Sequence, residues 1–371
     1  MARRTGLVWH EKMMWSEQGK HAGIIAANYP MQPGRHHENP ETKRRLKNLL
    51  DASGFTEQLV PVRPRPATRD ELARVHTGAY LDTLDRLNGE LAAVVGLDAA
   101  VTQGGVDIAK LAAGGCIAAV DAIMKREVDN AYALVRPVGH HAEPGEGKGF
   151  CILANPSVAA AHALAAHGAK RVAIVDIDVH HGNGAETIFW KDPRVLTVSV
   201  HQARWFPPDR GDLEARGEGD GFGTNLNIPL PAGSGIGAYQ STMARVILPA
   251  LRRFRPNFLV VPCGFDAAAH DQLGRMMLDA EAYRDLAAQF VAAAAELCGG
   301  RLLVTHEGGY NESMVPFLGI AVVEAMSGLD SGVVDPHRGF FTNAPGQELQ
   351  PHQAAVIEAA SRLVGDIPLP R

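Results

Sequence analysis

The chain has 371 residues, of which 46% are hydrophobic and 21% are charged, as in an ordinary folded protein. Its net charge of -5 and pI near 6.3 argue against the basic surface of a dedicated nucleic-acid-binding protein. No run of about eighteen apolar residues occurs, and the basic start of the chain is followed by a segment too short and polar for a signal peptide. We therefore expect a cytoplasmic protein that binds neither nucleic acid nor membrane.

Short apolar segments alternate with longer helical patterns along the chain. The strands that we predict are Gly6–Trp9, Asn130–Arg136, Arg171–Asp176, Val195–Val200, Phe258–Cys263 and Arg301–Thr305. The helices that we predict are Pro40–Ala52, Ala79–Leu87, Val106–Lys125, Pro156–His167, Ala238–Phe254, Ala280–Leu297 and Glu312–Ser327. Continuous apolar strand segments are typical of a parallel sheet covered by helices on both faces. The alternation predicts one doubly wound α/β domain over residues 1–371, with a core at about 5–335 and a C-terminal helical extension at about 349–365.

Four long irregular segments interrupt this pattern. They are His10–Asn39, Val138–Gly149, Gln202–Asn225 and Gly264–Leu278. Loops of this length inside a compact domain are usually functional or disordered. Each begins at or just past the carboxyl end of a predicted strand, where open α/β sheets place their binding sites. We expect the functional site at this edge of the sheet.

The sequence contains a candidate metal site at the ends of two predicted strands. Asp176, Asp178 and His180 alternate along a strand end, so their side chains point to one side. A carboxylate and an imidazole two residues apart make half of a site for zinc or iron(II). Asp266 follows a second apolar strand and would supply a third ligand at the same edge. Three protein ligands leave a position free for water and substrate, as catalytic zinc requires. The alternative, a solvated turn, is disfavoured by the apolar strand before these residues and the glycines after them.

Two further segments carry groups suited to proton transfer and carbonyl binding. His140 and His141 follow a buried strand and open a glycine-rich loop, and a histidine there can move a proton between water and a leaving amine near neutral pH. Tyr310 follows two glycines, and its phenol can donate a hydrogen bond to a developing oxyanion. Taken alone, a pair of adjacent histidines is better explained as surface residues, and a tyrosine after two glycines fits a packed loop equally well. The other adjacent pair, His36 and His37, is predicted to be a surface or structural pair.

Together and in this order, the four segments closely resemble the histone deacetylase and acetylpolyamine amidohydrolase superfamily. The motifs are Arg-Pro-x-Gly-His-His at 136–141, Asp-x-Asp-x-His-His-Gly-Asn-Gly at 176–184, Gly-Phe-Asp at 264–266 and Glu-Gly-Gly-Tyr at 307–310. The resemblance extends from His36 to about Asp335. Asn183 stands where class I enzymes carry aspartate, so the chain is most similar to bacterial class II-like histone deacetylase-like amidohydrolases. The resemblance implies an arginase-like fold with an eight-stranded, mostly parallel sheet and helices on both faces.

The resemblance also implies a role for each site residue. Asp178, His180 and Asp266 match the zinc ligands, and Tyr310 matches the tyrosine that polarises the substrate carbonyl. His140 pairs with Asp176, and His141, near Asn183, matches the histidine that acts as general base and acid. A structural potassium ion is implied at a second set of residues. These are Asp176, Asp178, His180, Ser199 and Val200.

A substrate tunnel is implied as well. Gly149, Phe150 and Phe206 match its walls, and Asp98 matches loosely an acid at the rim that binds substrate backbone. Leu273 stands where polyamine deacetylases carry an acidic gatekeeper.

The resemblance therefore implies zinc-dependent hydrolysis of an N-acetyl or short N-acyl amide, with acyl-lysine as the favoured substrate, which releases acetate and a free amine. An acetylpolyamine deacetylase is the alternative. An arginase-like ureohydrolase is disfavoured because Gly182 and Ala268 replace acids that would bridge a second metal. A non-catalytic scaffold that binds acylated ligands also stays open. The segment His10–Asn39 would cover the tunnel rim through a subunit contact, so we expect a homo-oligomer, either a dimer or a tetramer.

Overall fold

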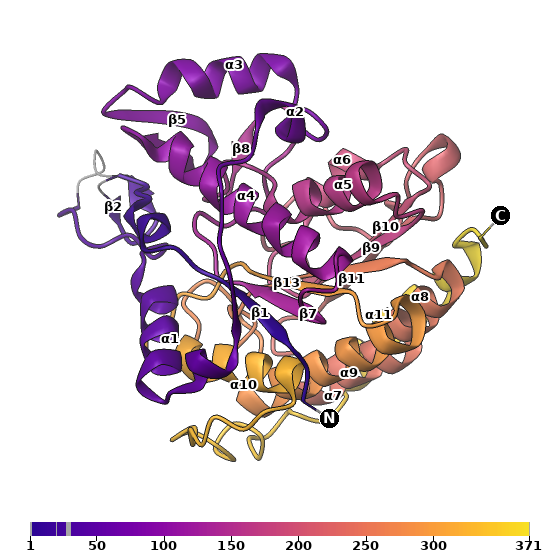
Figure 1. The fold of residues 1–371 in the computed structure, drawn as a ribbon. Helices are drawn as coiled ribbons and strands as arrows, with labels where there is room; N and C mark the ends of the chain where they lie inside the picture. The colour runs from indigo at the N-terminus through magenta and orange to yellow at the C-terminus, as the bar shows by residue number, and fades with distance from the viewer. Residues whose placement is uncertain (1, 20, 27–30, 371) are drawn as a thin grey trace.

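The computed structural model describes residues 2–19, 21–26 and 31–370. Residues 20 and 27–30, within the segment predicted to cover the rim, lie outside the described residues. The chain folds around an eight-stranded sheet in which every neighbouring pair of strands is parallel (Figure 1). The strand order is β11-β10-β9-β12-β13-β7-β1-β4. The bounds are β1 (Thr5–Val8), β4 (Val60–Val62), β7 (Asn130–Ala133), β9 (Val172–Asp176), β10 (Val195–Gln202), β11 (Asn225–Leu230), β12 (Phe258–Cys263) and β13 (Leu302–His306).

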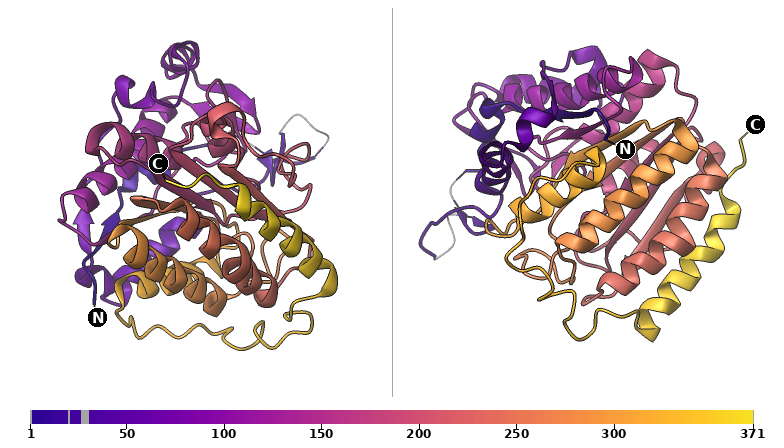
Figure 2. Two further views of the ribbon diagram at one scale, coloured as in Figure 1. Left: turned by 90° about the vertical axis from the view of Figure 1, so that its right-hand side faces the viewer. Right: turned by 60° about the horizontal axis from the view of Figure 1, so that its bottom comes forward.

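Helices cover both faces of the sheet, as Figures 1 and 2 show. The helices on one face are α2 (Arg69–Leu72), α3 (Gly78–Leu87), α4 (Gly105–Met124), α5 (Asn155–His167) and α6 (Asn183–Phe189). Those on the other are α1 (Glu41–Ala52), α7 (Ile236–Thr242), α8 (Leu248–Phe254), α9 (Ala280–Cys298), α10 (Val315–Ser327) and α11 (Pro351–Leu363). Because strand side chains alternate between faces, Ala173 and Val175 join one core while Val172 and Ile174 join the other. This double covering explains why the strands are apolar throughout.

The six predicted strands correspond to β1, β7, β9, β10, β12 and β13, with ends that shift by a few residues. The sequence reading missed both edge strands of the sheet. β4 contains Pro61, and β11 contains Pro229 and lies largely beyond the segment predicted to be a loop. Proline cannot donate a ladder hydrogen bond, so it is tolerated at a sheet edge but weakens the sequence signal for a strand.

Several helices differ from their predicted form. α2 and α6 were not predicted: α2 has only four residues, and α6 begins with the last two residues of the metal motif, Asn183 and Gly184. The predicted helix Ala238–Phe254 is divided into α7 and α8 by a π-helical turn at Met243–Ile247. α10 begins at Val315 rather than Glu312, and a turn comes before it in which Oδ1 of Asn311 accepts hydrogen bonds from the backbone N–H groups of Ser313 and Met314.

The loops at the carboxyl ends of the strands form one rim of the molecule. A small sheet of β5 (Ala92–Leu97), β6 (Ala99–Thr102) and β8 (Gly147–Lys148) stands beside this rim, and β2 (His21–Ala22) pairs with β3 (Ile25–Ala26) nearby in the chain. At the other end of the chain, α11 packs against β11 and α7.

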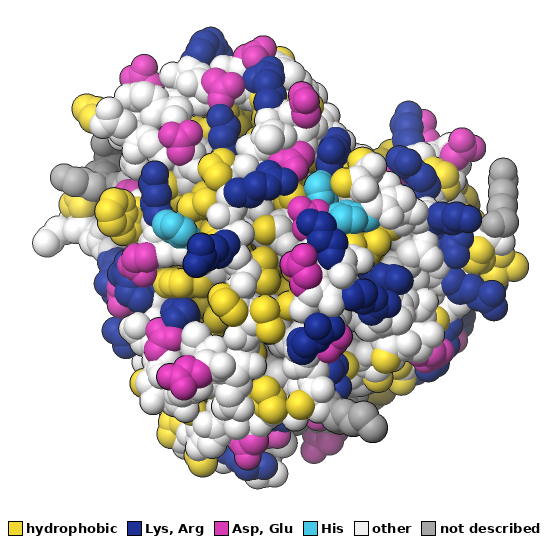
Figure 3. Space-filling model, viewed as in Figure 1, with side chains coloured by type: hydrophobic (Ala, Val, Ile, Leu, Met, Phe, Trp, Pro, Cys, Tyr) yellow, Lys and Arg dark blue, Asp and Glu magenta, His cyan; other side chains and the backbone are white. Residues whose placement is uncertain are grey.

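Charges of both signs are interspersed on the face shown in Figure 3, with no large area of one sign. In the part of the chain that the structure describes, no helix is long and apolar enough to cross a membrane.

Candidate active site

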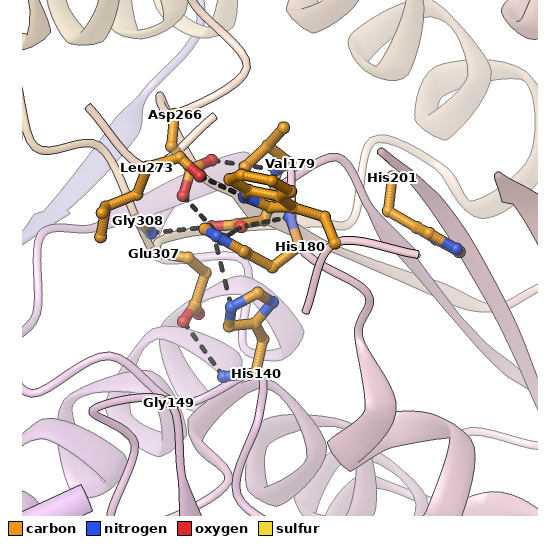
Figure 4. Close-up of polar contacts among 12 residues, drawn as sticks. His140, Gly149, Val179, His180, His201, Asp266, Leu273, Glu307 and Gly308 are labelled. Carbon is orange, nitrogen blue, oxygen red and sulfur yellow. Dashed lines mark hydrogen bonds and ion pairs between the residues drawn. The ribbon is translucent and has the colours of Figure 1, made fainter. Parts of the chain in front are cut away.

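Three potential metal ligands meet at the carboxyl ends of two neighbouring strands. Asp178 and His180 follow β9, and Asp266 follows β12, which lies next to β9 in the sheet. Their ligand atoms all lie within 4.8 Å of one another, and all three side chains are buried. Nδ1 of His180 is 2.9 Å from Oδ1 of Asp178 and 3.1 Å from Oδ2 of Asp266. Figure 4 shows His180 and Asp266 side by side in this group.

The surroundings of these three residues fit a cation. Oδ2 of Asp266 is buried and accepts no well-directed hydrogen bond from the described residues. Burial and the nearby Asp178 carboxylate raise the pKa of Asp266 to about 7, which reflects the cost of two carboxylates in one buried place. Gly264 and Gly308 leave the space free, because a Cβ atom on either would lie within about 2 Å of a carboxylate oxygen. Two carboxylates and one imidazole are a donor set that zinc binds at catalytic centres, and iron(II) also accepts it.

The two tandem histidines have different environments. Nδ1 of His140 is 3.0 Å from Oδ2 of Asp176, whereas Nδ1 of His141 is 2.6 Å from Oδ1 of Asn183. Burial lowers the pKa of His140, but the Asp178 and Asp176 carboxylates outweigh that effect and raise it to about 10. Burial together with the charges on His140 and His180 holds the pKa of His141 well below its usual value. The ring centroids of the two histidines are 3.9 Å apart, and their pKa values are shifted in opposite directions.

Glu307 holds the backbone of the loop that carries His140 and His141. Glu307 belongs to the Glu-Gly-Gly-Tyr motif, but the sequence alone indicated no function for it. Oε2 of Glu307 accepts hydrogen bonds from the backbone N–H groups of Gly139 at 2.7 Å and His140 at 3.2 Å (Figure 4). Its Oε1 atom accepts one from the hydroxyl of Thr305. The only available signal in the sequence was an acidic residue directly after an apolar strand.

Tyr310 is also placed by an acid that the sequence reading missed. The backbone N–H of Tyr310 donates to Oδ2 of Asp271 at 2.6 Å, and the Tyr310 ring packs edge-on against Phe150. Burial, followed by the Asp266 and Asp178 charges, raises the pKa of the Tyr310 phenol well above its usual value. The phenol therefore keeps its proton and can donate a hydrogen bond.

A cavity of about 210 Å³ connects these groups to the surface. Its lining residues are Ile24, Asp98, His141, Gly149, Phe150, His180, Trp205, Phe206, Leu273 and Tyr310. The structure thus brings together all the residues expected in the tunnel and adds Ile24 and Trp205 at its mouth. Nε1 of Trp205 donates to the carbonyl of Leu273, which joins two loops across the rim.

Asp98 occupies the turn between β5 and β6 and has φ 51°, a left-handed conformation that is uncommon outside glycine. Its carbonyl accepts a hydrogen bond from the backbone N–H of Phe150 at 2.7 Å. The turn is thereby held against the tunnel wall. His36, in the pair predicted to be on the surface or structural, is buried with its ring edge-on to Phe150, and His37 is half-buried.

The residues expected around potassium lie on the adjacent strands β9 and β10 and in the segment that follows β9. Ser199 in β10 is the register partner of Asp176 in β9, and Val200 follows it in the buried part of β10. Oγ of Ser199 lies within hydrogen-bond distance of the backbone N–H of Gly182 and of Nδ1 of His201.

A second group with metal-binding side chains lies elsewhere, between α4 and α5. Nε2 of His162 and Nε2 of His167 are 2.8 and 2.6 Å from Oδ1 of Asp121. Arg74 faces Nδ1 of His162 at 2.9 Å and can only donate, so the proton of this imidazole is on Nε2. A protonated Nε2 cannot bind a metal, and the contacts are those of a hydrogen-bonded cluster.

Comparison with known proteins identifies the family of the chain. A family model described as the histone deacetylase domain matches residues 36–326. The chain is 46% identical over 358 residues to a histone deacetylase-like amidohydrolase of Pseudomonas aeruginosa, covering 96% of this chain and 93% of that protein. It is 34% identical over 336 residues to a probable deacetylase of Archaeoglobus fulgidus, covering 89% and 88% of the two chains. The crystal structure of the HDA15 HD domain has a TM-score of 0.84 and 30% sequence identity, covering 97% of this chain and 94% of that one. The chain belongs to the histone deacetylase family.

Proposed function

We propose that the protein is a zinc-dependent deacetylase that hydrolyses an N-acetyl or short N-acyl amide, with acyl-lysine as its substrate class. The observation that carries this proposal is the buried group Asp178, His180 and Asp266 beside two histidines that face Asp176 and Asn183, at the inner end of an apolar cavity. Zinc, or iron(II) in its place, would be held by those three residues. When bound, the metal would polarise the acyl carbonyl and lower the pKa of the attacking water.

The side chains of this chain then divide the proton transfers between them. Nδ1 of His141 is occupied by Asn183, so Nε2 is the nitrogen that takes a proton from the attacking water. The water oxygen bonds to the acyl carbon, and the carbon–nitrogen bond breaks. The same Nε2 atom gives its proton to the departing amine, and the acyl group leaves as acetate.

Two other residues stabilise the negative charge that develops on the acyl oxygen. Tyr310 retains its phenolic proton and donates a hydrogen bond to that oxygen. His140, whose Nδ1 atom is 3.0 Å from the Asp176 carboxylate, contributes positive charge beside the reacting groups.

The cavity favours acyl-lysine over an acetylated polyamine. Phe150 and Phe206 provide aromatic walls for an alkyl stem, and Leu273 at the gatekeeper position is apolar. Asp98 is the one acid among the residues described as lining the cavity. A polyamine carries further positive charges along its chain, and an apolar mouth gives these little compensation. Acetylpolyamine hydrolysis is the alternative, because the Asp98 carboxylate at the rim could attract one positive charge of a polyamine.

We further propose that a structural potassium ion binds against Asp176, Asp178, His180, Ser199 and Val200. We also propose that residues 1–371 form a single deacetylase domain and that the protein is a cytoplasmic homo-oligomer, either a dimer or a tetramer.

A two-metal ureohydrolase is disfavoured by Gly182 as well as by Ala268. A Cβ atom at Gly182 would lie only 2.4 Å from Oδ2 of Asp176, so an acidic side chain has no room there.

The proposal is tested by measuring bound zinc and steady-state turnover on three substrates: an acetyl-lysine peptide, acetylspermidine and acetylputrescine. We expect about one zinc per chain and the highest kcat/KM on the peptide. A higher kcat/KM on either acetylated polyamine would assign the alternative. One bound zinc without turnover of any acyl amide would indicate a non-catalytic scaffold.

A further inference from the structure

Glu143 contacts the candidate site at a position that the proposed mechanism does not use. It lies two residues beyond His141, and its side chain is buried. Its Oε1 atom accepts hydrogen bonds from Nδ2 of Asn183 and from Nζ of Lys148, both at 2.7 Å. Glu143 is therefore bonded to the same amide group that faces His141.

The orientation of that amide decides which nitrogen of His141 carries the proton. An amide has an acceptor side, Oδ1, and a donor side, Nδ2. With Oδ1 of Asn183 facing Nδ1 of His141 at 2.6 Å, the neutral imidazole is protonated at Nδ1, and Nε2 keeps a free lone pair. If the amide were turned over, Nδ2 would donate to Nδ1, and the proton would have to be on Nε2. Only the first orientation leaves Nε2 able to accept a proton.

Two acceptors fix Nδ2 of Asn183 on the side away from the imidazole. One is Oε1 of Glu143, and the other is the backbone carbonyl of His141 at 3.0 Å. Turning the amide over would place its oxygen against both. Glu143 is the stronger acceptor, because hydrogen bonds to ionised groups are about twice as strong as neutral ones. Lys148 forms ion pairs with Glu143 at 2.7 Å and with Glu146 at 2.9 Å.

We propose that Glu143 is a positioning residue that fixes the amide of Asn183 and thereby the Nδ1-protonated tautomer of His141. The inference rests on the proposed role of His141 as the base. It also explains why Asn183 has a buried acidic partner. An aspartate at position 183 would present an acceptor oxygen to His141 in either orientation and would need no partner to orient it.

A double-mutant cycle separates this role from a general structural one. Glu143→Leu removes the acceptor, and we expect about a tenfold lower kcat on the acetyl-lysine peptide with little change in KM. In an Asn183→Asp background the same replacement leaves kcat unchanged or raises it, because it removes a carboxylate facing the new aspartate. Glu146→Gln is the matched control: Glu146 also bonds Lys148 but has no described contact with Asn183. We expect its kcat to stay within about twofold of the wild type. An equal loss from Glu143→Leu in both backgrounds would refute the proposal.

The tautomer itself provides a readout that does not require turnover. Nitrogen-15 spectra of imidazole-labelled, zinc-loaded protein at pH 8 would identify His141 by the signals lost in His141→Gln. We expect protonation at Nδ1 in the wild type and a population protonated at Nε2 in Glu143→Leu. Nε2 protonation in the wild type, or unchanged Nδ1 protonation in Glu143→Leu, would overturn the inference. If the wild type proved inactive on every acyl amide, the proposed function would fail, yet these spectra would still decide the role of Glu143.

Thermal unfolding and zinc content establish whether Glu143→Leu is folded. If it is not, Glu143→Gln replaces it in both experiments, since glutamine has nearly the same shape and no charge. We expect glutamine to give a kcat between those of the wild type and an acceptor-free variant, with a smaller Nε2-protonated population. Wild-type kcat together with detectable Nε2 protonation would break the proposed link between tautomer and rate.

Discussion

Replacing Tyr310 by phenylalanine isolates the hydrogen bond proposed for the acyl oxygen. The change removes one oxygen atom and leaves the ring. The ring packs edge-on against Phe150 with centroids 6.0 Å apart, and the backbone N–H is held by Asp271 at 2.6 Å. Neither contact involves the phenolic hydroxyl, so we expect the variant to keep its fold, its metal site and its substrate affinity.

The size of the effect follows from the number of donors removed. Tyr310 supplies one neutral donor to an oxygen that becomes charged only as the reaction proceeds. Losing one such donor costs about 2.7 kcal/mol in transition-state stabilisation, which corresponds to about a hundredfold lower kcat. KM should change little, because the donor acts mainly on the transition state.

The assay compares kcat and KM for an acetyl-lysine peptide, with zinc content measured on the same samples. Tyr239→Phe is the matched control: its hydroxyl is buried and has no hydrogen-bond partner among the described residues. We expect the control to keep wild-type kcat. A near-normal kcat for Tyr310→Phe with full zinc content would refute the assignment, and a large rise in KM alone would show that the hydroxyl binds ground-state substrate.

Three further predictions address the metal, the buried charges and the pH dependence of stability. Asp266→Asn removes a charged ligand from the buried triad, so bound zinc after dialysis should fall well below one equivalent. The control is Asp192→Asn, which changes an aspartate that pairs with Arg194 in a loop away from the site, and this variant should retain its zinc. Glu38→Ala leaves the buried Arg136 without its bidentate partner and should lower the free energy of unfolding by about 3–5 kcal/mol in chemical denaturation; a loss below about 1 kcal/mol would show that the pair contributes little. Burial lowers the pKa of His76 to about 4, below an unfolded value near 6.5, so its contribution to stability is present above pH 6.5 and is lost as pH falls towards 4. Between pH 8 and pH 5 this loss should be about 2 kcal/mol, and His76→Gln should reduce the decline by that amount; equal declines in both proteins would contradict the linkage.

The sequence by itself determined the features that depend on residues close together in the chain. Asp178 and His180 are two positions apart after an apolar strand, so strand geometry directs both side chains to one side without tertiary information. The carboxyl ends of parallel strands meet at one edge, which made Asp266 a reasonable third ligand. The apolar strand segments likewise indicated a sheet covered on both faces, and the eight-stranded sheet of the structure is covered by helices on both faces.

Only the tertiary structure decided which distant groups support the site. Glu307 holds the backbone of His140 from 167 residues away, and Glu143 reaches Asn183 from a different loop. The residues on either side of an acidic residue do not indicate whether its side chain is solvated or hydrogen-bonded to a buried amide, because that depends on which distant segments pack against it. The edge strands β4 and β11 escaped prediction for a related reason: each contains a proline, and each is held in the sheet by pairing with only one other strand, β1 for β4 and β10 for β11. Neighbouring residues in the sequence therefore indicate which side chains bind the metal, whereas the tertiary structure determines which distant residues hold those side chains in position.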